Sequence, residues 1–433
     1  MNDAERERLF DLIRVPSVSA LAEHDADMAL AADMVAGELE RAGASVRISH
    51  EGRHPLVLGS AGPEDGRRVI VYGHYDVQPI GEPELWRSPP FEPTVRDGYL
   101  YARGSSDDKG NLFMLLVAAQ RLAAAGRLGV RLDFLIDGEE ESGGTSAEEW
   151  LAADPDPAHA AVIFDAPMIG PGRPAFCVGV RGLLYRRITV RVSESDAHSG
   201  IYGGAALNAA LALHEVIAAV RPRDGRVPEP LHAGVAPPSA AERAAWKELP
   251  DGGQVLSEAG LLVADADAAD AFYERTTALP SVDVHGLSAG EPHAVKTNIP
   301  AAATATLSLR LAPGQSPEVV GESLDALMRA AVPPGAELEI THHGAASAAV
   351  MDPEHPVLVA AADGFEQALE RRPVPVRTGG SIPIVAAFTG RGIPTVLTGF
   401  GLPDDGIHGP NERLAMDHLE FGVRAAMGMF DAL

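Results

Sequence analysis

The chain has 433 residues, a formal net charge of −26 and a pI near 4.9. This length exceeds what one ordinary hydrophobic core organises, so we expect two domains. The acidic composition argues against a basic groove for nucleic acid or an anionic membrane. The single cysteine, Cys177, excludes an intrachain disulfide and a thiolate metal cluster, and it fits a reducing compartment.

The N-terminus is charged and amphipathic, and it lacks the apolar stretch of a signal peptide. No segment approaches the ~18 consecutive apolar residues that a membrane helix requires. We therefore expect a soluble, cytoplasmic protein with neither nucleic-acid nor membrane partners.

The first part of the chain alternates helical and extended patterns. Helical spacing covers residues 3–14 and 27–42, and it returns from about 110 to 126. Predicted strands cover residues 45–49, 69–72, 99–102, 130–136 and 161–164. The alternation predicts an α/β fold with a doubly wound sheet and helices on both faces.

The pattern changes after residue 182. Strands are predicted at 183–192, 301–311 and 337–342, with helices at 206–220 and 317–331 and an irregular Pro/Ala-rich region at 221–280. This order predicts a smaller α+β domain inserted into the first. The original pattern returns with a helix at 357–369, a strand at 395–398 and a closing helix from about 417. We expect one domain of residues 1–182 and 351–433, and an inserted domain of residues 183–350.

Polar residues follow three of the predicted strands in the first domain. His74, the run Glu139–Glu141 and Asp165 each lie just past the end of a strand. Open α/β sheets bind ligands along that edge. In addition, Asp76 follows His74 by two residues and can orient the imidazole, as carboxylates usually do for metal-binding histidines.

The candidate metal ligands are His74, Asp107, Glu140, Glu141, Asp165 and His408. Two imidazoles with several carboxylates and no thiolate suit zinc, manganese or cobalt. A catalytic metal usually takes three protein ligands, whereas five ligands divide over two metals about 3.5–4 Å apart if one carboxylate bridges them. A remaining glutamate beside a hydroxide between the metals would be its general base. The set therefore predicts a dinuclear metallohydrolase.

Taken singly, each of these residues has a simpler explanation. A run of three glutamates is usually a solvated loop, and an aspartate such as Asp165 can cap a helix. A lone histidine in a Gly/Pro-rich loop, as at His408, is more often a surface residue, and Arg310 could simply pair with an acidic neighbour. For the glutamates, the preceding strand and the Ser142-Gly143 that follows favour the metal site. For Asp165, His408 and Arg310, the functional interpretation rests on the family resemblance given next.

Five motifs occur along the chain: His74-x-Asp76, Ser106-Asp107-Asp108-Lys109-Gly110, Glu140-Glu141-Ser142-Gly143, Asp165 and His408. In order and spacing they resemble a known family of dinuclear metallopeptidases, which includes carnosinase, glutamate carboxypeptidase, acetylornithine deacetylase and succinyl-diaminopimelate desuccinylase. The resemblance covers nearly the whole chain.

The resemblance implies a role for each of these residues. Asp107 would bridge two metals, of which His74 and Asp165 complete one. Glu141 and His408 would complete the other. Glu140 would act as general base and then as general acid, and Asp76 would orient His74. A cis peptide bond is implied between Asp107 and Asp108.

Further motifs are His198-Ser199-Gly200-x-Tyr202-Gly203-Gly204, Thr297-Asn298-Ile299-Pro300, Arg310 and Arg377-x-Gly379-Gly380-Ser381-Ile382-Pro383. Within the family, these resemble the carnosinase and cytosolic non-specific dipeptidase branch. This likeness implies a homodimer formed by lid domains, in which His198 reaches the partner's active site and holds the carbonyl oxygen. Arg310 and Ser381 would bind the substrate's C-terminal carboxylate. Further substrate contacts are expected from Asn298, Gly380 and His343.

We therefore expect a hydrolase with two divalent metal ions per subunit, zinc or manganese, with cobalt also suited to the ligands. It would cleave dipeptides or short peptides that have a free C-terminal carboxylate. An N-acyl-amino-acid deacylase or desuccinylase, or a carboxypeptidase, would use the same metals. A catalytically silent binding or scaffold dimer is the alternative from another class, and the presence of every ligand and of the base disfavours it.

Overall fold

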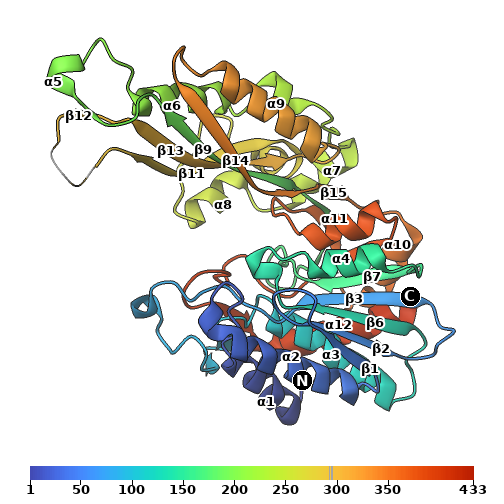
Figure 1. Ribbon diagram of the computed structural model, residues 1–433. Helices are drawn as coiled ribbons and strands as arrows, with labels where there is room; N and C mark the ends of the chain where they lie inside the picture. Colours follow the sequence, from blue (N-terminus) through green and yellow to red (C-terminus); the bar gives the residue numbers. More distant parts are fainter. Residues whose placement is uncertain (292, 294–295) are drawn as a thin grey trace. The chain divides into compact units, whose positions relative to one another are not determined.

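The computed structural model describes residues 1–291, 293 and 296–433, which divide into two compact units (Figure 1). The first unit contains residues 1–178, 351–376 and 387–433, and the second contains residues 179–350 and 377–386. Residues 377–386, which we expected in the first domain, group with the second unit. The reason is backbone pairing: Thr378 donates to the carbonyl of Gly179, and Arg181 donates to that of Gly380.

A six-stranded mixed sheet forms the centre of the first unit. Its order is β1 (Ser45–Ser49), β2 (Leu56–Ala61), β6 (Arg131–Asp137), β3 (Arg68–His74), β7 (Ala160–Phe164) and β17 (Thr395–Thr398). The last four strands are parallel, whereas β1–β2 and β2–β6 pair antiparallel. β3 is buried along its whole length, as expected for a parallel strand inside a sheet. The sequence analysis did not predict β2.

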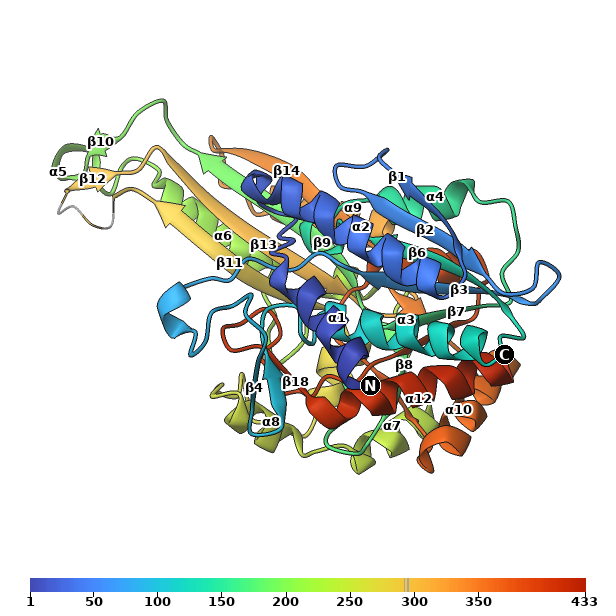
Figure 2. The same cartoon turned by 90° about the horizontal axis from the view of Figure 1, so that it is seen from below.

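Helices pack against this sheet and against one another (Figure 2). They are α1 (Asp3–Arg14), α2 (Asp25–Arg41), α3 (Lys109–Ala124), α4 (Ser146–Ala153), α10 (Pro356–Leu369) and α12 (Met416–Ala432). α3 contacts β3 and β7 as well as α1, α2 and α12, so most of its residues are buried. α1 begins with a capping box between Asn2 and Glu5. Among the described residues, no helix has the length and apolarity needed to cross a membrane.

Several shorter elements lie between these helices and strands along the chain. They are the small sheet of β18 (Arg413–Ala415), β5 (Tyr99–Tyr101) and β4 (Thr94–Arg96), the strands β8 (Ala175–Val180), β15 (Ala349–Val350) and β16 (Val374–Arg377), the helix α11 (Pro383–Gly390), and the 3₁₀ turns η1 (Ala22–His24), η2 (Pro83–Leu85) and η3 (Glu140–Ser142). η3 follows β6 and carries two of the candidate site residues.

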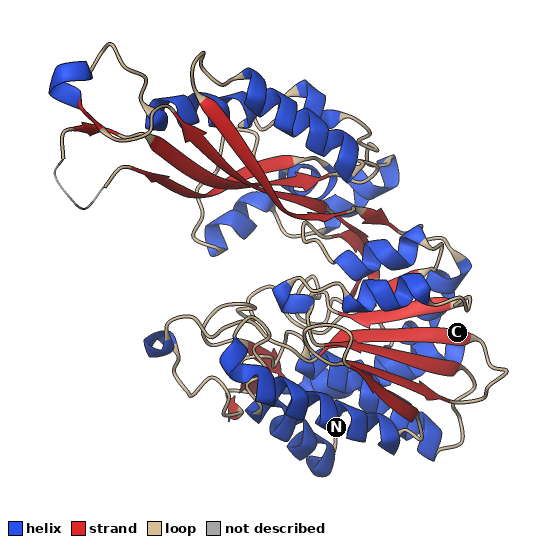
Figure 3. Ribbon diagram, in the orientation of Figure 1, coloured by secondary structure: helices blue, strands red, loops and turns tan. Residues whose placement is uncertain are grey.

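The second unit contains a four-stranded antiparallel sheet (Figure 3). Its order is β11 (Ser281–Ala289), β13 (Ala302–Leu311), β9 (Gly182–Arg191) and β14 (Glu337–Ala346). Helices α6 (Ala209–Val220) and α9 (Pro317–Ala330) contact the sheet and enclose an apolar core, to which β9 contributes Leu184, Ile188 and Val190. The predicted fold class, an α/β sheet with an inserted α+β part, is confirmed.

The region 221–280 contains more regular structure than we expected. It forms η4 (Glu229–His232), α7 (Ala240–Ala245), η5 (Trp246–Glu248), α8 (Gly252–Glu258) and the short π-helix η6 (Glu274–Ala278). Two further short strands, β10 (Ala197–His198) and β12 (Asn298–Ile299), pair antiparallel beside α5 (Ser199–Tyr202).

Candidate metal centre

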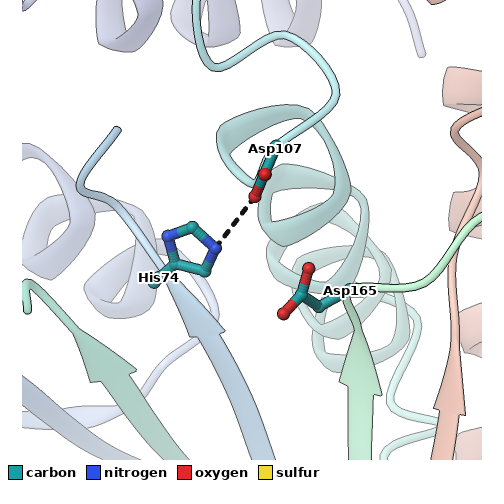
Figure 4. Close-up of side chains that lie close together, drawn as sticks. All are labelled: His74, Asp107 and Asp165. Carbon is teal, nitrogen blue, oxygen red and sulfur yellow. Dashed lines mark ion pairs between the residues drawn. The ribbon is translucent and has the colours of Figure 1, made fainter. Parts of the chain in front are cut away.

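The carboxyl ends of three parallel strands meet at one edge of the first unit's sheet. β3 ends at His74, β7 is followed by Asp165, and β6 leads into η3 with Glu140 and Glu141. Because these strands are neighbours, their terminal side chains gather at the edge where open α/β sheets bind ligands. Figure 4 shows His74 and Asp165 at two strand ends, with Asp107 facing them from the start of α3.

Asp107 lies between two groups of potential metal ligands. The ligand atoms of His74, Asp107 and Asp165 lie within 4.8 Å of one another, and so do those of Asp107, Glu141 and His408. Oδ1 of Asp107 is 3.1 Å from Nε2 of His74, and Oδ2 is 2.9 Å from Nε2 of His408. One carboxylate therefore belongs to both three-residue groups.

The chemistry of these groups fits two cations. Among the residues that the structure describes, the buried Oε1 of Glu141 has no hydrogen-bond partner, and Nε2 of His74 has Oδ1 of Asp107 within 3.1 Å but no hydrogen bond of regular geometry. Burial raises the pKa of Asp165 to about 7, and repulsion from Asp107 adds to this shift. Burial, together with the charges of Asp165 and Glu141, also raises the pKa of Glu140 well above its ordinary value. Divalent cations among these carboxylates would relieve the repulsion.

Asp76 connects two of the candidate ligands. Nδ1 of His74 donates to the backbone carbonyl of Asp76 at 3.1 Å and lies 3.3 Å from its Oδ1. Oδ2 of Asp76 accepts from the backbone N–H of Glu141 at 3.0 Å and from Oγ of Ser19 at 2.6 Å. Burial lowers the pKa of His74, but its contacts with Asp107 and Asp76 outweigh that and raise it well above 6.5. With Nδ1 directed to Asp76, Nε2 is left to face the other ligands.

The buried carboxylate of Glu412 holds the loop that presents Asp107. Its Oε1 accepts the backbone N–H groups of Ser106 at 2.9 Å and Asp107 at 3.1 Å. Its Oε2 accepts from Nη1 of Arg103 at 2.7 Å and from the N–H of Gly104 at 3.1 Å. The peptide bond after Asp107 is cis, as the resemblance implied. We did not assign Glu412 a role from sequence, although it follows His408 in the same motif.

The loop that carries His408 is shaped by its own hydrogen bonds. His408 has a left-handed backbone with a φ of 64°, and Oδ2 of the buried Asp405 accepts from the N–H of Leu402 at 2.6 Å. The His408 side chain is exposed, and its contacts with Asp107 and Glu141 raise its pKa to about 10. Sequence reasoning also missed Gln78, whose Nε2 donates to Oε2 of Glu141 at 2.8 Å.

The candidate substrate contacts all lie in the second unit, in three separate places. In the first, His198 of β10 lies directly opposite Asn298 of β12, and its Nδ1 accepts from the N–H of Gly200 at 3.0 Å. The second is at the far end of β13, where Arg310 lies. The span of β13 from residue 302 to 310 corresponds to about 26 Å at ~3.3 Å per residue. His198 and Arg310 of one chain therefore do not meet on one small ligand.

The second place brings Arg310 together with Ser381. Nη1 of Arg310 donates to Oγ of Ser381 at 2.7 Å, and Gly380 directly precedes this serine. In the third place, His343 of β14 packs edge-on against the ring of Tyr185, with ring centroids 6.3 Å apart. The sequence analysis assigned Arg310 and Ser381 together to the substrate's carboxylate, and the second unit brings these two side chains into contact.

Comparison with known proteins gives a consistent result. Residues 70–431 match Peptidase family M20/M25/M40. The cysteinylglycine-S-conjugate dipeptidase of Corynebacterium striatum is 30% identical over 441 residues, which cover 96% of this chain and 93% of that protein. The Cys-Gly metallodipeptidase DUG1 of Saccharomyces cerevisiae is 28% identical over 387 residues, covering 86% and 80% respectively.

A solved structure agrees over the full length. The M20 family metallo-carboxypeptidase Sso-CP2 from Sulfolobus solfataricus matches with a TM-score of 0.90 and 25% identity, covering 100% of this chain and 99% of that one. The match with peptidase relatives confirms the resemblance that the motifs indicated.

Proposed function

The chain belongs to peptidase family M20/M25/M40, and from this premise we propose that it is a dipeptidase with two divalent metal ions per subunit. The observation that carries the proposal is the position of Asp107, whose carboxylate belongs to both three-residue groups. The donor set suits zinc or manganese, and also cobalt. His74 and Asp165 would hold one ion, and Glu141 and His408 the other. When bound, the two ions supply Lewis acidity, which polarises a scissile carbonyl and lowers the pKa of a water between them.

Glu140 is the general base in this proposal. Its carboxylate takes a proton from the attacking water as the water oxygen bonds to the carbonyl carbon. Glu140 then gives that proton to the leaving nitrogen as the C–N bond breaks. The burial and negative surroundings that raise its pKa help it to hold the proton between the two steps. Asp76 keeps His74 in the orientation that directs Nε2 toward Asp107.

The substrate is a short peptide with a free C-terminal carboxylate. The two relatives described above act on Cys-Gly or on cysteinylglycine conjugates by their names, which supports a dipeptide substrate. A guanidinium beside a hydroxyl, as at Arg310 and Ser381, suits recognition of a carboxylate. Asn298, Gly380 and His343 are proposed as further substrate contacts.

We also propose a homodimer in which His198 acts in the partner's active site. His198 pairs with Asn298 before the start of β13, whereas Arg310 lies about 26 Å further along that strand. This supports the arrangement, because a dipeptide spans only about 7 Å. A histidine and an arginine that both contact one dipeptide would then come from different subunits. The imidazole of His198 would hold the carbonyl oxygen as negative charge develops on it.

A cytoplasmic location is part of the proposal. The chain has one cysteine, Cys177, and it is buried. Proteins that persist in oxidising compartments more often carry paired cysteines.

The second candidate function is that of a carboxypeptidase. The high TM-score with the Sulfolobus metallo-carboxypeptidase favours it, since the same metals and the same carboxylate site would serve longer peptides. An N-acyl-amino-acid deacylase would use the same site as well, with an acyl group in place of the N-terminal residue.

The test is metal-dependent hydrolysis by apo-protein reloaded separately with zinc, manganese or cobalt. The substrate panel contains free dipeptides, a β-alanyl dipeptide, tripeptides, N-blocked dipeptides and N-acetyl or N-succinyl amino acids. A dipeptidase cleaves the free dipeptides fastest and loses activity on the N-blocked ones. Preferential release of the last residue from tripeptides and N-blocked peptides would instead establish the carboxypeptidase. Preference for the acyl amino acids would establish the deacylase.

A further inference from the structure

Arg181 joins three segments of the second unit. It lies between β8 and β9, and its backbone N–H donates to the carbonyl of Gly380 at 3.0 Å. Its side chain continues the contact, because Nε donates to the carbonyl of Gly379 at 3.1 Å. Nη1 donates to Oγ of Ser281, the first residue of β11, at 3.1 Å. One arginine therefore holds both the 379–380 loop and the start of β11.

These two segments flank the pair formed by Arg310 and Ser381. Ser281 is the direct cross-strand partner of Arg310 in the β11–β13 ladder. Ser381 follows Gly380 and accepts from Nη1 of Arg310 at 2.7 Å. Through Ser281 and Gly380, Arg181 fixes the immediate neighbour of each member of the pair.

The loop packs tightly against the Arg181 guanidinium. A Cβ at Gly379 would lie 2.5 Å from the carbonyl oxygen of Thr276 and 3.2 Å from Nη2 of Arg181. No side chain fits there without movement of backbone. Glycine at this position therefore lets the loop lie directly on the guanidinium.

Arg181 and Arg310 both bring positive charge to this part of the second unit. Arg181 is 8% exposed, and its acceptors are carbonyls and a hydroxyl. Within the part of the chain that the structure describes, no carboxylate forms an ion pair with Arg181 or Arg310. Burial, together with the charge of Arg310, lowers the pKa of Arg181 to about 10, while the charge of Asp283 acts in the opposite direction. Buried charges are normally paired, so this site suits an anionic ligand.

We propose that Arg181 is a positioning residue for the carboxylate end of the substrate, and that it forms with Arg310 and Ser381 a two-guanidinium site that selects a free carboxylate over an amide. Arg181 acts in two ways, by holding the loop that carries Ser381 and by adding a second positive charge. The inference rests on the proposed function, in which Arg310 and Ser381 face the C-terminal carboxylate.

The test compares a free dipeptide, Ala-Leu, with its C-terminal amide. The variants are Arg181→Met, which removes the charge, and Arg181→Lys, which keeps the charge but not the planar fork. Arg191→Met is the matched control, because Arg191 is exposed at the other end of the same strand β9. Steady-state kinetics give KM and kcat for both ligands. Calorimetry in a metal-loaded Glu140→Ala background gives the Kd for both without turnover.

In Arg181→Met we expect KM and Kd for Ala-Leu to rise about tenfold or more, with kcat changed about threefold at most. The same constants for the amide should change little, so the preference for the free acid shrinks. Arg181→Lys should recover part of the loss, and Arg191→Met should match the wild type.

If KM and Kd rose equally for the acid and the amide in both Arg181 variants, Arg181 would have only a structural role, and the proposal would be overturned. Unchanged constants would overturn it too. If the wild type hydrolyses neither ligand, the proposed function fails. In that case the calorimetric Kd values still test the role of Arg181. The wild type should bind the acid more tightly than the amide, and Arg181→Met should lose this preference.

Discussion

The backbone N–H of Asp107 donates to Oε1 of Glu412 at 3.1 Å, so a buried carboxylate holds the backbone of the residue that belongs to both three-residue groups. Glu412→Gln keeps the size of the side chain but removes the charge that binds Arg103 and the loop. Residues that orient metal ligands contribute about 10–100-fold to affinity, so we expect zinc to bind that much more weakly. Competition with a chelating dye measures this constant.

Glu354→Gln provides the control for Glu412, since Glu354 is exposed in a loop after β15. Its metal affinity should equal that of the wild type. A Glu412→Gln protein that melts at a lower temperature but binds zinc as tightly as the wild type would limit Glu412 to a structural role. Glu412→Ala is less informative, because it leaves the buried Arg103 unpaired.

Substitution of Glu140 should separate catalysis from metal binding. Glu140→Ala removes the proposed base but none of the proposed ligands, so kcat should fall by about 10²–10⁴-fold. Elemental analysis of the purified variant should still give the metal content of the wild type. Near-normal turnover in this variant, with full metal content, would remove Glu140 from the mechanism.

Metal removal should lower stability as well as activity. The crowded carboxylates repel one another, so apo-protein prepared with EDTA should melt at a lower temperature than the reloaded protein. Free metal at about 100 times its Kd would stabilise the fold by about 2.7 kcal/mol. Asp107→Asn should lose most of this gain, because Asp107 belongs to both three-residue groups. An equal metal-induced shift in that variant would argue against the site.

Asp137 should make stability depend on pH. Burial raises its pKa from 3.8 to about 7, and the Asp76 carboxylate adds to the shift. Below about pH 4 both the folded and the unfolded chain keep this proton, whereas between about pH 4 and 7 only the folded chain keeps it. Because the unfolded chain then binds fewer protons, the free energy of unfolding falls by up to about 1.4 kcal/mol per pH unit in that window.

Asp137→Asn cannot ionise and should lack this contribution. The unfolding free energy of the variant minus that of the wild type should grow by about 3 kcal/mol from pH 5 to pH 8. Chemical denaturation of both proteins, each loaded with manganese, measures the difference. A value that stays constant with pH would mean that Asp137 ionises normally in the folded protein.

Mixed dimers test the action of His198 across subunits. His198→Ala and Glu140→Ala homodimers should each be nearly inactive. After the two proteins are unfolded and refolded together, half of the dimers are mixed, and one of their two sites has both residues intact. Recovery of about a quarter of wild-type activity is therefore expected. Absence of recovery in dimers shown to be mixed would place His198 in its own subunit's site.

The sequence alone determined the class of fold and the residues of the candidate metal centre. Long amphipathic helices such as 3–14 and 317–331 follow from periodicity, which is a local property. The candidate metal ligands were recognisable because they lie in short motifs, most of them at the end of a strand or near the start of a helix. The strands β2 and β11 went unpredicted. β11 is largely exposed and has an irregular register, so its apolar pattern is weak.

Which distant segments of the chain meet follows from the folded arrangement and could not be predicted from the sequence. The order β6-β3-β7 puts Glu141 and Asp165 on either side of His74, although 66 and 90 residues separate them from it along the chain. The hydrogen bond from the backbone N–H of Asp107 to Glu412 joins two residues that lie 305 positions apart in the sequence. A hydrogen bond or cross-strand contact of this kind depends on the final packing and leaves no periodic trace in the sequence. The supporting residues, unlike the ligands themselves, therefore emerge only when the chain is folded.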